Sequence, residues 1–289
     1  MPTINEVKEQ MVVVRSVGDF TGAMQQIATL RMMRLRKKVL ESRPFVEAAL
    51  GLLRELASLR NALDTKSLLS LEKKQKDTPH AKLHAERRAV IVITSNQGLS
   101  GIYNVEIYSK VAKIIAEESE SDFFVIGKKG QEYFGNGHFP VQSFPYEVPD
   151  NFAISDLKRL IALFDYYGHV TLVYSRFINT ATREVVTTTI VNPIPEESDD
   201  TTKQPGKYTY EPDIDELIDG ISRKLRGALF QQQIFDARLS QFAAQMIGMQ
   251  TASDNATELL GDLQMEYNKA RRKLIDKKIS EVFAGSALW

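Results

Sequence analysis

The chain has four histidines, the side chains best suited to bind a metal ion or transfer a proton near neutral pH. His80 and His84 have the spacing of the HExxH zinc motif, but the glutamate that follows the first histidine of that motif is absent. His138 and His169 stand apart from this pair in the sequence. The histidine pattern therefore predicts no metal site.

Other reactive groups are equally scattered. Cysteine is absent, which excludes disulfides, zinc–thiolate sites and thiol catalysis. No serine, histidine and aspartate fall on elements that must converge, and the acidic pair Glu117–Glu118 is typical of a solvated helix face. We assign no catalytic residue and expect neither a cofactor nor a metal.

Two glycine-containing turns could hold phosphate. Ser95–Gly101 (SNQGLSG) follows an apolar run, at the position where open α/β sheets bind ligands. It lacks the three-glycine dinucleotide fingerprint, and the chain contains no GxxxxGK[ST] sequence. Gly98 and Gly101 are better explained by backbone conformations closed to other residues, and Gly127–Gly130 (GKKG) by a tight turn with exposed lysines. We assign no nucleotide site.

The composition is that of a globular protein, with 289 residues, 43% hydrophobic and 26% charged. No apolar run approaches the roughly 18 residues needed to cross a bilayer, and the N-terminus lacks the order of a signal peptide. Basic and acidic residues number 37 each, so net charge does not favour nucleic acid. Two basic clusters, at Arg31–Lys38 and Lys269–Lys278, are either solvated helix faces or a track past an acidic partner.

The C-terminal part predicts one long helix, because no proline follows Pro212 and apolar residues recur in steps of four and three. A sustained 3.5-residue period is the signature of a coiled-coil seam. Such a helix would be about 100 Å long, longer than a globular core of this size is wide. The predicted seam consists of Ile221, Leu225, Ala228, Gln232, Phe235, Leu239, Phe242, Met246, Met249, Ser253, Ala256, Leu260, Leu263, Tyr267, Ala270 and Leu274.

The N-terminal part predicts a second long helix. Thr3 and Glu6 form a capping box that places its start near residue 3. Gly18 and Gly22 weaken the helix, and Pro44 is expected to kink or break it before an apolar continuation over Val46–Leu59. Its predicted seam is Ile4, Val7, Met11 and Val14, continued less regularly by Val17, Met24 and Ile27.

The middle of the chain alternates short β-branched runs with helical spacing, which implies βαβ units and a small, mainly parallel sheet. Expected strands are Ala89–Thr94, Phe123–Ile126, His169–Tyr174 and an edge or hairpin strand at Arg183–Val191. Expected helices are Ile102–Glu118, a short one through Phe134, and Ile154–Tyr167.

We therefore predict an α/β protein in which the N- and C-terminal helices form a long antiparallel coiled coil. A small, mainly parallel, Rossmann-like α/β domain is inserted between them. The expected boundaries are residues 1–61 for the first helix, 62–88 for a connector, 89–194 for the α/β domain, 195–212 for a loop and 213–289 for the last helix.

Several motifs together resemble one family over nearly the whole chain. They are Ser240–Ala256 (SQFAAQMIGMQTASDNA), Leu263–Asn268 (LQMEYN), Gly285–Leu288 (GSAL), Thr94–Asn104 (TSNQGLSGIYN) and Gly127–Phe134 (GKKGQEYF). Each is weak alone, but in this order and spacing they are specific. The chain resembles the gamma subunit of F-type ATP synthases.

The resemblance implies a central rotor shaft that transmits torque and catalyses nothing itself. Implied partners are the alpha and beta subunits, the epsilon subunit and the ring of c subunits, without nucleic acid. The implied location is the cytoplasmic side of the cell membrane, reached peripherally through the complex. Residues expected to contact the alpha/beta hexamer are Arg31, Arg34, Lys37, Met246, Leu260, Leu263, Tyr267, Asn268, Arg271, Arg272, Ile275 and Asp276.

The sequence departs from the family pattern at several positions. Gln241 and Gln245 replace a glutamate and an arginine, and Ser100 replaces a cysteine. Arg272 and Asp276 stand where other residues are usual, so the beta-subunit contacts there are not carried over with the motif. These departures resemble the alternative branch of the family, some of whose members pump sodium. Two other hypotheses remain: a static coiled-coil tether with an α/β module, and a small α/β enzyme with helical arms.

Overall fold

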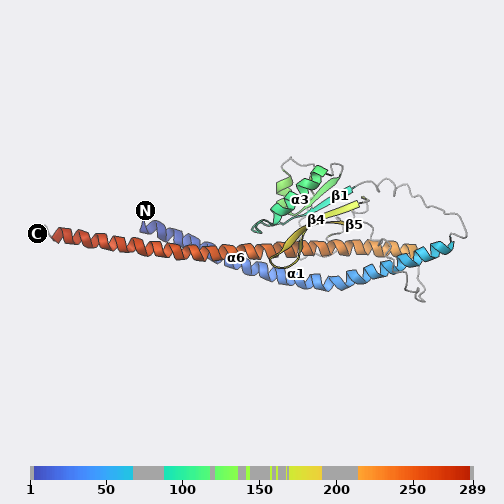
Figure 1. Cartoon of the computed structure of the whole chain (residues 1–289), viewed down its shortest axis with the longest axis horizontal. Coiled ribbons are helices and arrows are strands. Elements are labelled where there is room, and N and C mark those ends of the chain that lie inside the picture. Colours follow the sequence, from blue (N-terminus) through green and yellow to red (C-terminus); the bar gives the residue numbers. More distant parts are fainter. Residues whose placement is uncertain are drawn as a thin grey trace.

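Two long helices dominate the computed structural model (Figure 1). They are α1 (Ile4–Ser67) and α6 (Ile214–Ser286), which run antiparallel and side by side, with a small sheet against one side of the pair. With 73 residues, α6 is about 110 Å long, and its C-terminal end projects past the start of α1. The structure describes residues 3–67, 88–117, 121–135, 141–143, 157, 161, 167, 169–190 and 214–286.

The start of α1 confirms the predicted capping box. The Glu6 carboxylate accepts a hydrogen bond from the Thr3 backbone N–H at 2.9 Å, and the Thr3 hydroxyl accepts one from the Glu6 N–H at 3.3 Å. Each side chain therefore satisfies an N–H group that the first helical turn leaves without a partner.

Pro44 does not break α1, contrary to one of the two expected outcomes. The helix is continuous from Ile4 to Ser67 with Pro44 inside it, and it extends beyond the predicted end at residue 61. Pro44 is exposed, whereas Val39 and Val46 on either side of it are buried. Packing on both sides of the proline holds the helix together despite the lost backbone hydrogen bond.

The buried stripe of α6 coincides with the predicted seam. Between Gln250 and Ala270 the side chains that are not exposed are Ser253, Ala256, Leu260, Leu263, Tyr267 and Ala270, with Ala252 beside them. Leu274, the last predicted seam residue, is 45% exposed, and every residue from 271 to 284 is likewise exposed.

The predicted seam of α1 is wrong after Val14. Val17 and Ile27 are exposed, at 48% and 43%, and Met24 is only partly buried. In that segment small and polar residues occupy the positions that face α6, so the large apolar side chains did not indicate the seam. The stripe continues in steps of four and three through Gly18, Thr21, Gln25, Ala28, Met32, Leu35, Val39, Ser42, Val46, Ala49, Leu53 and Leu56.

The sheet is mixed and confirms the expected strands. Its strands are β1 (Arg88–Ile93), β2 (Asp122–Ile126), β3 (Val141–Ser143), β4 (His169–Phe177) and β5 (Arg183–Ile190). They lie in the order β3-β2-β1-β4-β5, with β5 antiparallel at the edge and the other pairings parallel. The short strand β3 was not predicted.

The described helices of the α/β part are α3 (Tyr103–Glu117) and α4 (Lys128–Phe134). The predicted turn at Gly127–Gly130 is partly wrong, because Lys128 already begins α4. Other predictions lie wholly or mainly outside the described residues: the rest of the connector with His80 and His84, His138, the helix over Ile154–Tyr167, and the loop 195–212. His169 begins β4 and is exposed.

The sheet is covered on both faces, which explains its continuously apolar strands. One face, through residues such as Ile91 and Leu172, packs against Phe235 and Leu239 of α6, and Leu35 of α1 joins the same cluster. The other face packs against α3 and α4. Every residue of α6 from 237 to 245 is buried, so this part of the helix lies between α1 and the sheet.

Candidate functional site

The described residues contain no catalytic or metal-binding cluster, so the candidate site is the surface of the helix pair. No three histidine, aspartate or glutamate side chains gather within the described ranges in a way that could hold a metal ion. No described helix is long and apolar enough to cross a membrane.

Contacts along the pair fix its antiparallel register. A methyl group added at Gly18 would lie 3.4 Å from the Ala256 Cβ, and the Gln25 side-chain amide donates a hydrogen bond to that of Gln250. Farther along, the Arg31 guanidinium lies 5.5 Å from the centre of the Phe242 ring. The residue numbers rise on α1 as they fall on α6, and the small residues allow close approach of the two backbones.

The α/β part is fastened to the middle of α6 by buried polar contacts. The Tyr103 hydroxyl donates to the Ala237 carbonyl at 3.1 Å, and the hydroxyls of Ser175 and Ser240 are 2.8 Å apart. Gln241, one of the departures from the family pattern, accepts a hydrogen bond from Arg238 Nη1 at 2.7 Å within the same helix. Because these groups are buried, each bond satisfies a polar atom that water does not reach.

Tyr103→Phe is expected to make the protein less stable by about 1 kcal/mol at neutral pH, because the bond to Ala237 is lost. Burial raises the pKa of the Tyr103 hydroxyl above its usual value, so folding favours the neutral form. The wild-type chain should therefore lose stability above about pH 10, and the variant should lose less. Urea unfolding at about pH 8 and about pH 10.5 measures the difference in free energy of unfolding between wild type and variant, which should be smaller at the higher pH. A difference independent of pH would contradict it.

The predicted basic contacts divide into two kinds. Arg31 lies over the Phe242 ring and thus faces α6 in part. Arg34 and Lys37 are exposed, and the Lys37 ammonium is 3.8 Å from the carboxylate of Glu41 one turn later. An exposed ion pair of this kind contributes at most about 1 kcal/mol to stability. Arg34 and Lys37 therefore both remain accessible to a partner.

The predicted contacts on α6 also divide. Leu263 is 7% exposed, and Met246, Leu260 and Tyr267 are partly buried. These four belong to the stripe that faces α1. The others lie on the exposed part of the helix: Asn268, Arg271, Arg272, Ile275 and Asp276.

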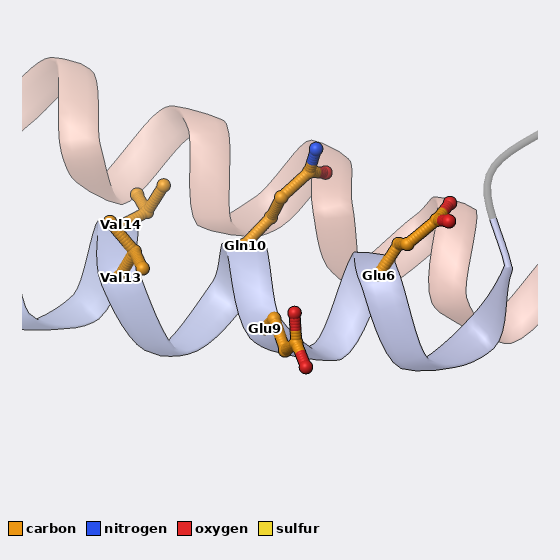
Figure 2. A pocket seen from close by; sticks show the side chains of 5 residues that line it. All are labelled: Glu6, Glu9, Gln10, Val13 and Val14. Carbon is orange, nitrogen blue, oxygen red and sulfur yellow. The ribbon is translucent and has the colours of Figure 1, made fainter.

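A shallow depression lies along the first turns of α1 and is lined by Glu6, Glu9, Gln10, Val13 and Val14 (Figure 2). Val14 extends toward α6, whereas Glu9 extends away from it. The depression has no cluster of converging polar groups, so it is a surface groove and not a small-molecule site.

Comparison with known proteins then decides the family. A family model described as ATP synthase matches residues 3–288. The chain is 28% identical to the ATP synthase gamma chains of Psychrobacter sp. (strain PRwf-1) and of Halothermothrix orenii, each over 99% of both chains. This chain belongs to the ATP synthase gamma family.

Two solved structures have a similar fold. The central stalk of the Tetrahymena thermophila mitochondrial ATP synthase gives a TM-score of 0.58 at 16% identity, over 81% of this chain and 99% of the other. A chain of the Euglena gracilis mitochondrial enzyme gives 0.51 at 14% identity, over 92% and 94%. At these identities the likeness concerns the fold alone.

Sequence reasoning missed some exposed residues of this gamma-family chain. Val282 and Phe283 near the end of α6 are 72% and 70% exposed, and Ile279 is 49% exposed. The signal was in the sequence, because Ile275, Ile279 and Val282 continue the helical spacing past Leu274. All residues from 271 to 284 are exposed, so no other described part of the isolated chain covers this end of α6.

Polar groups of the turn Ser95–Gly101 form hydrogen bonds with Asn104 and with the start of α4, whereas the buried Ser100 hydroxyl has no hydrogen-bond partner among the described residues. The side-chain carbonyl of Asn104 accepts a hydrogen bond from the Ser95 N–H at 3.1 Å, and its amide donates to the Ser95 hydroxyl at 2.7 Å. Of the two glycines assigned to special backbone conformations, Gly101 has a φ of +57° and Gly98 is not among the residues with positive φ.

Proposed function

We propose that the chain is the central rotor shaft of an F-type ATP synthase, which transmits torque between the ion-translocating membrane ring and the catalytic alpha/beta hexamer. The observation that carries this proposal is the projecting end of α6, which extends past α1 and exposes apolar residues such as Val282 and Phe283. An exposed apolar helix end of this size needs a surrounding protein surface. Because the chain belongs to the gamma family, we infer that this surface is the bore of the alpha/beta hexamer.

The two long helices act together as an antiparallel coiled coil in this proposal. The alternation of four- and three-residue steps on both helices supports it. The antiparallel register also supports it, because Gly18 lies beside Ala256 and the Lys38 ammonium lies 5.8 Å from the centre of the Phe235 ring. The α/β domain, at residues 89–194, lies outside the hexamer beside the epsilon subunit and the c-ring. The complex is peripheral to the cytoplasmic side of the membrane, and this chain is its non-catalytic subunit.

Coupling follows from asymmetry. A shaft made of two unlike helices cannot present the same surface to three beta subunits at once. Each rotational position therefore stabilises a different set of open and closed catalytic sites, through contacts that differ in free energy between those states. Ion flow turns the ring and shaft to drive synthesis, and hydrolysis turns them backwards.

The contact residues take different roles in this proposal. Exposed Asn268, Arg271, Arg272, Ile275 and Asp276 meet the beta subunits directly. Exposed Arg34 and Lys37 pass acidic loops of the same subunits. Arg31 interacts both with those loops and with the Phe242 ring. The half-buried and buried residues Met246, Leu260, Leu263 and Tyr267 contribute by holding α6 against α1.

Co-expression with the alpha and beta subunits of the same organism tests the proposal. We expect a complex of three alpha chains, three beta chains and one copy of this chain, measured by native mass spectrometry. The chain alone should scatter X-rays as a markedly elongated particle, because α6 is about 110 Å long. Recovery of a compact monomer that binds neither subunit would exclude the rotor role.

A further inference from the structure

Two tyrosine rings are stacked on each other on the side of the sheet that α3 and α4 cover. Tyr108 of α3 and Tyr133 of α4 have ring centroids 4.0 Å apart and ring planes within 6° of parallel. Aromatic pairs in proteins usually have centroids about 4.5–7 Å apart, in offset or T-shaped arrangements. The faces of the two phenol rings are therefore in direct contact.

A buried phenylalanine holds this stack in place. The Phe134 ring meets Tyr108 at 5.4 Å and Tyr133 at 5.0 Å, with interplanar angles of 85° and 89°. Phe134 is 2% exposed and belongs to the apolar cluster between the sheet and α3. Core packing of the two helices thus sets the position of the tyrosines.

The pair is open to solvent on one side. Tyr133 is 47% exposed, whereas Tyr108 is partly buried. A small reagent in solution can therefore reach the Tyr133 ring without unfolding of the chain. A radical formed on Tyr133 is in contact with a second phenol from the start.

The composition makes tyrosine a principal target of one-electron oxidation in this chain. Cysteine is absent, so no thiol can be oxidised in place of a phenol. Methionine is oxidised to its sulfoxide by uptake of an oxygen atom, which is a two-electron reaction. The side chains that remain as one-electron donors are the ten tyrosines and one tryptophan.

We propose that Tyr108 and Tyr133 form an oxidative cross-linking site, where a one-electron oxidant such as a peroxide-derived radical joins α3 to α4 through a dityrosine. Each phenol loses one electron to the oxidant and one proton to solvent, which gives two phenoxyl radicals. A carbon–carbon bond then forms between the ring carbons next to the hydroxyl-bearing carbons. The hydrogen on each bonded carbon moves to the neighbouring oxygen, so both phenols are restored and the chain has lost two hydrogen atoms.

The surroundings of the pair suit this reaction. Coupling requires one ring to leave the parallel stack, and the exposed Tyr133 can turn outward while Phe134 still packs against Tyr108. Burial, together with the neighbouring Tyr133 and Glu132, raises the pKa of Tyr108 to about 12. Tyr108 is therefore a neutral phenol at neutral pH, so its oxidation releases a proton as well as an electron.

The new bond closes a loop from residue 108 to residue 133, which contains β2. A cross-link of this kind restricts the unfolded chain and so favours the folded one. Both tyrosines belong to this chain and lie in its α/β part. The inference goes beyond the rotor role and does not depend on it.

Photo-oxidation of the full-length folded chain tests the site. Visible light with a ruthenium tris-bipyridyl sensitiser and persulfate removes electrons one at a time. We expect one dominant intramolecular product, in which the peptides that contain Tyr108 and Tyr133 are joined with loss of two hydrogen atoms, identified by mass spectrometry and dityrosine fluorescence. Its yield should not change when the protein is diluted. Dominant links between other tyrosines would overturn the proposal.

Two variants and an unfolded sample serve as controls. Tyr133→Phe keeps an aromatic ring at an exposed position, so the chain should fold and the product should fall to background. Tyr267→Phe removes a tyrosine from the α6 stripe that faces α1 and should leave the yield unchanged. Oxidation of the wild-type chain in concentrated urea should give several-fold less product, because the unfolded chain does not hold the rings together. Equal yields from the folded and unfolded chain would refute the role of the stack.

The stability of the product is the second readout. The cross-linked chain should unfold at a higher urea concentration than the untreated chain, followed by circular dichroism. The Tyr133→Phe variant, treated in the same way, should show no such rise. A cross-linked chain with a lowered midpoint would show that the bond does not fit the native arrangement of α3 and α4, and would overturn the proposal.

Discussion

Replacing Leu263 with aspartate is expected to separate the two long helices near the start of α1. Leu263 is 7% exposed and lies two turns beyond the contact of Gly18 with Ala256. Loss of the leucine costs about 2–5 kcal/mol, and a carboxylate buried without a partner costs more. Hydrogen exchange of the α1 amides from residue 4 to about residue 20 should therefore become markedly faster in the variant.

The matched control is Leu259→Asp, because Leu259 is on the same helix but 47% exposed. The same change of side chain at an exposed position should alter stability by less than about 1 kcal/mol and leave exchange in α1 unchanged. In the assembled complex, replacing Leu263, or Leu260 beside it, should also uncouple ATP hydrolysis from ion pumping. If Leu263→Asp and Leu259→Asp behave alike, the buried stripe of α6 is misassigned.

The contrast between α6 and α1 shows where sequence reasoning about helix pairs fails. On α6 most positions of the stripe that faces α1 are large and apolar from Phe235 to Leu263, so the 3.5-residue period could be read directly. On α1 the stripe positions between Val14 and Met32 are glycine, threonine, glutamine and alanine, which carry little hydropathy signal. The prediction therefore placed the exposed residues Val17 and Ile27 on the seam. When one helix carries two possible stripes, its sequence alone does not show which of them faces the other helix.

The sheet was easier to predict than its edges. Strands β1, β2 and β4 are buried on both faces and therefore have short continuous apolar runs, which a local pattern reveals. The strand β3 has three residues, Val141–Ser143, and depends on pairing with β2 more than on its own sequence. Pro44 was misjudged for a similar reason, since the packing that keeps α1 continuous comes from residues distant in the chain.

From the sequence the candidate contact residues could be assigned to the two long helices, but not sorted into those that face α1 and those that are exposed. Periodicity put Leu263 and Tyr267 on the stripe, and the motif put Asn268 and Arg271 beside them. Only the three-dimensional register distinguishes a residue that faces α1 from one that faces a partner. The structure also shows that every residue of α6 from 271 to 284 is exposed, including the apolar Val282 and Phe283.

The other large effect is expected at the glycines between β2 and α4. Gly127 has a φ of +108°, and a Cβ there would lie 2.4 Å from the Thr94 carbonyl oxygen; at Gly130 a Cβ would lie 2.5 Å from the Thr94 hydroxyl. Thr94 cannot move aside, because its hydroxyl donates to the Ile126 carbonyl at 2.9 Å and accepts from the Gly130 N–H at 3.1 Å. Alanine at either glycine therefore forces β1 and α4 apart.

Gly127→Ala and Gly130→Ala should each destabilise the protein by about 2–4 kcal/mol, through overpacking at both positions and backbone strain at Gly127. Gly98→Ala is the matched control, because its nearest neighbouring atom would be 3.9 Å away at the end of the flexible Lys129 side chain. Urea unfolding followed by circular dichroism compares the three variants, and the control should lie within about 1 kcal/mol of wild type. A control as unstable as Gly130→Ala would show that the turn, and not the contact with Thr94, sets the requirement for glycine.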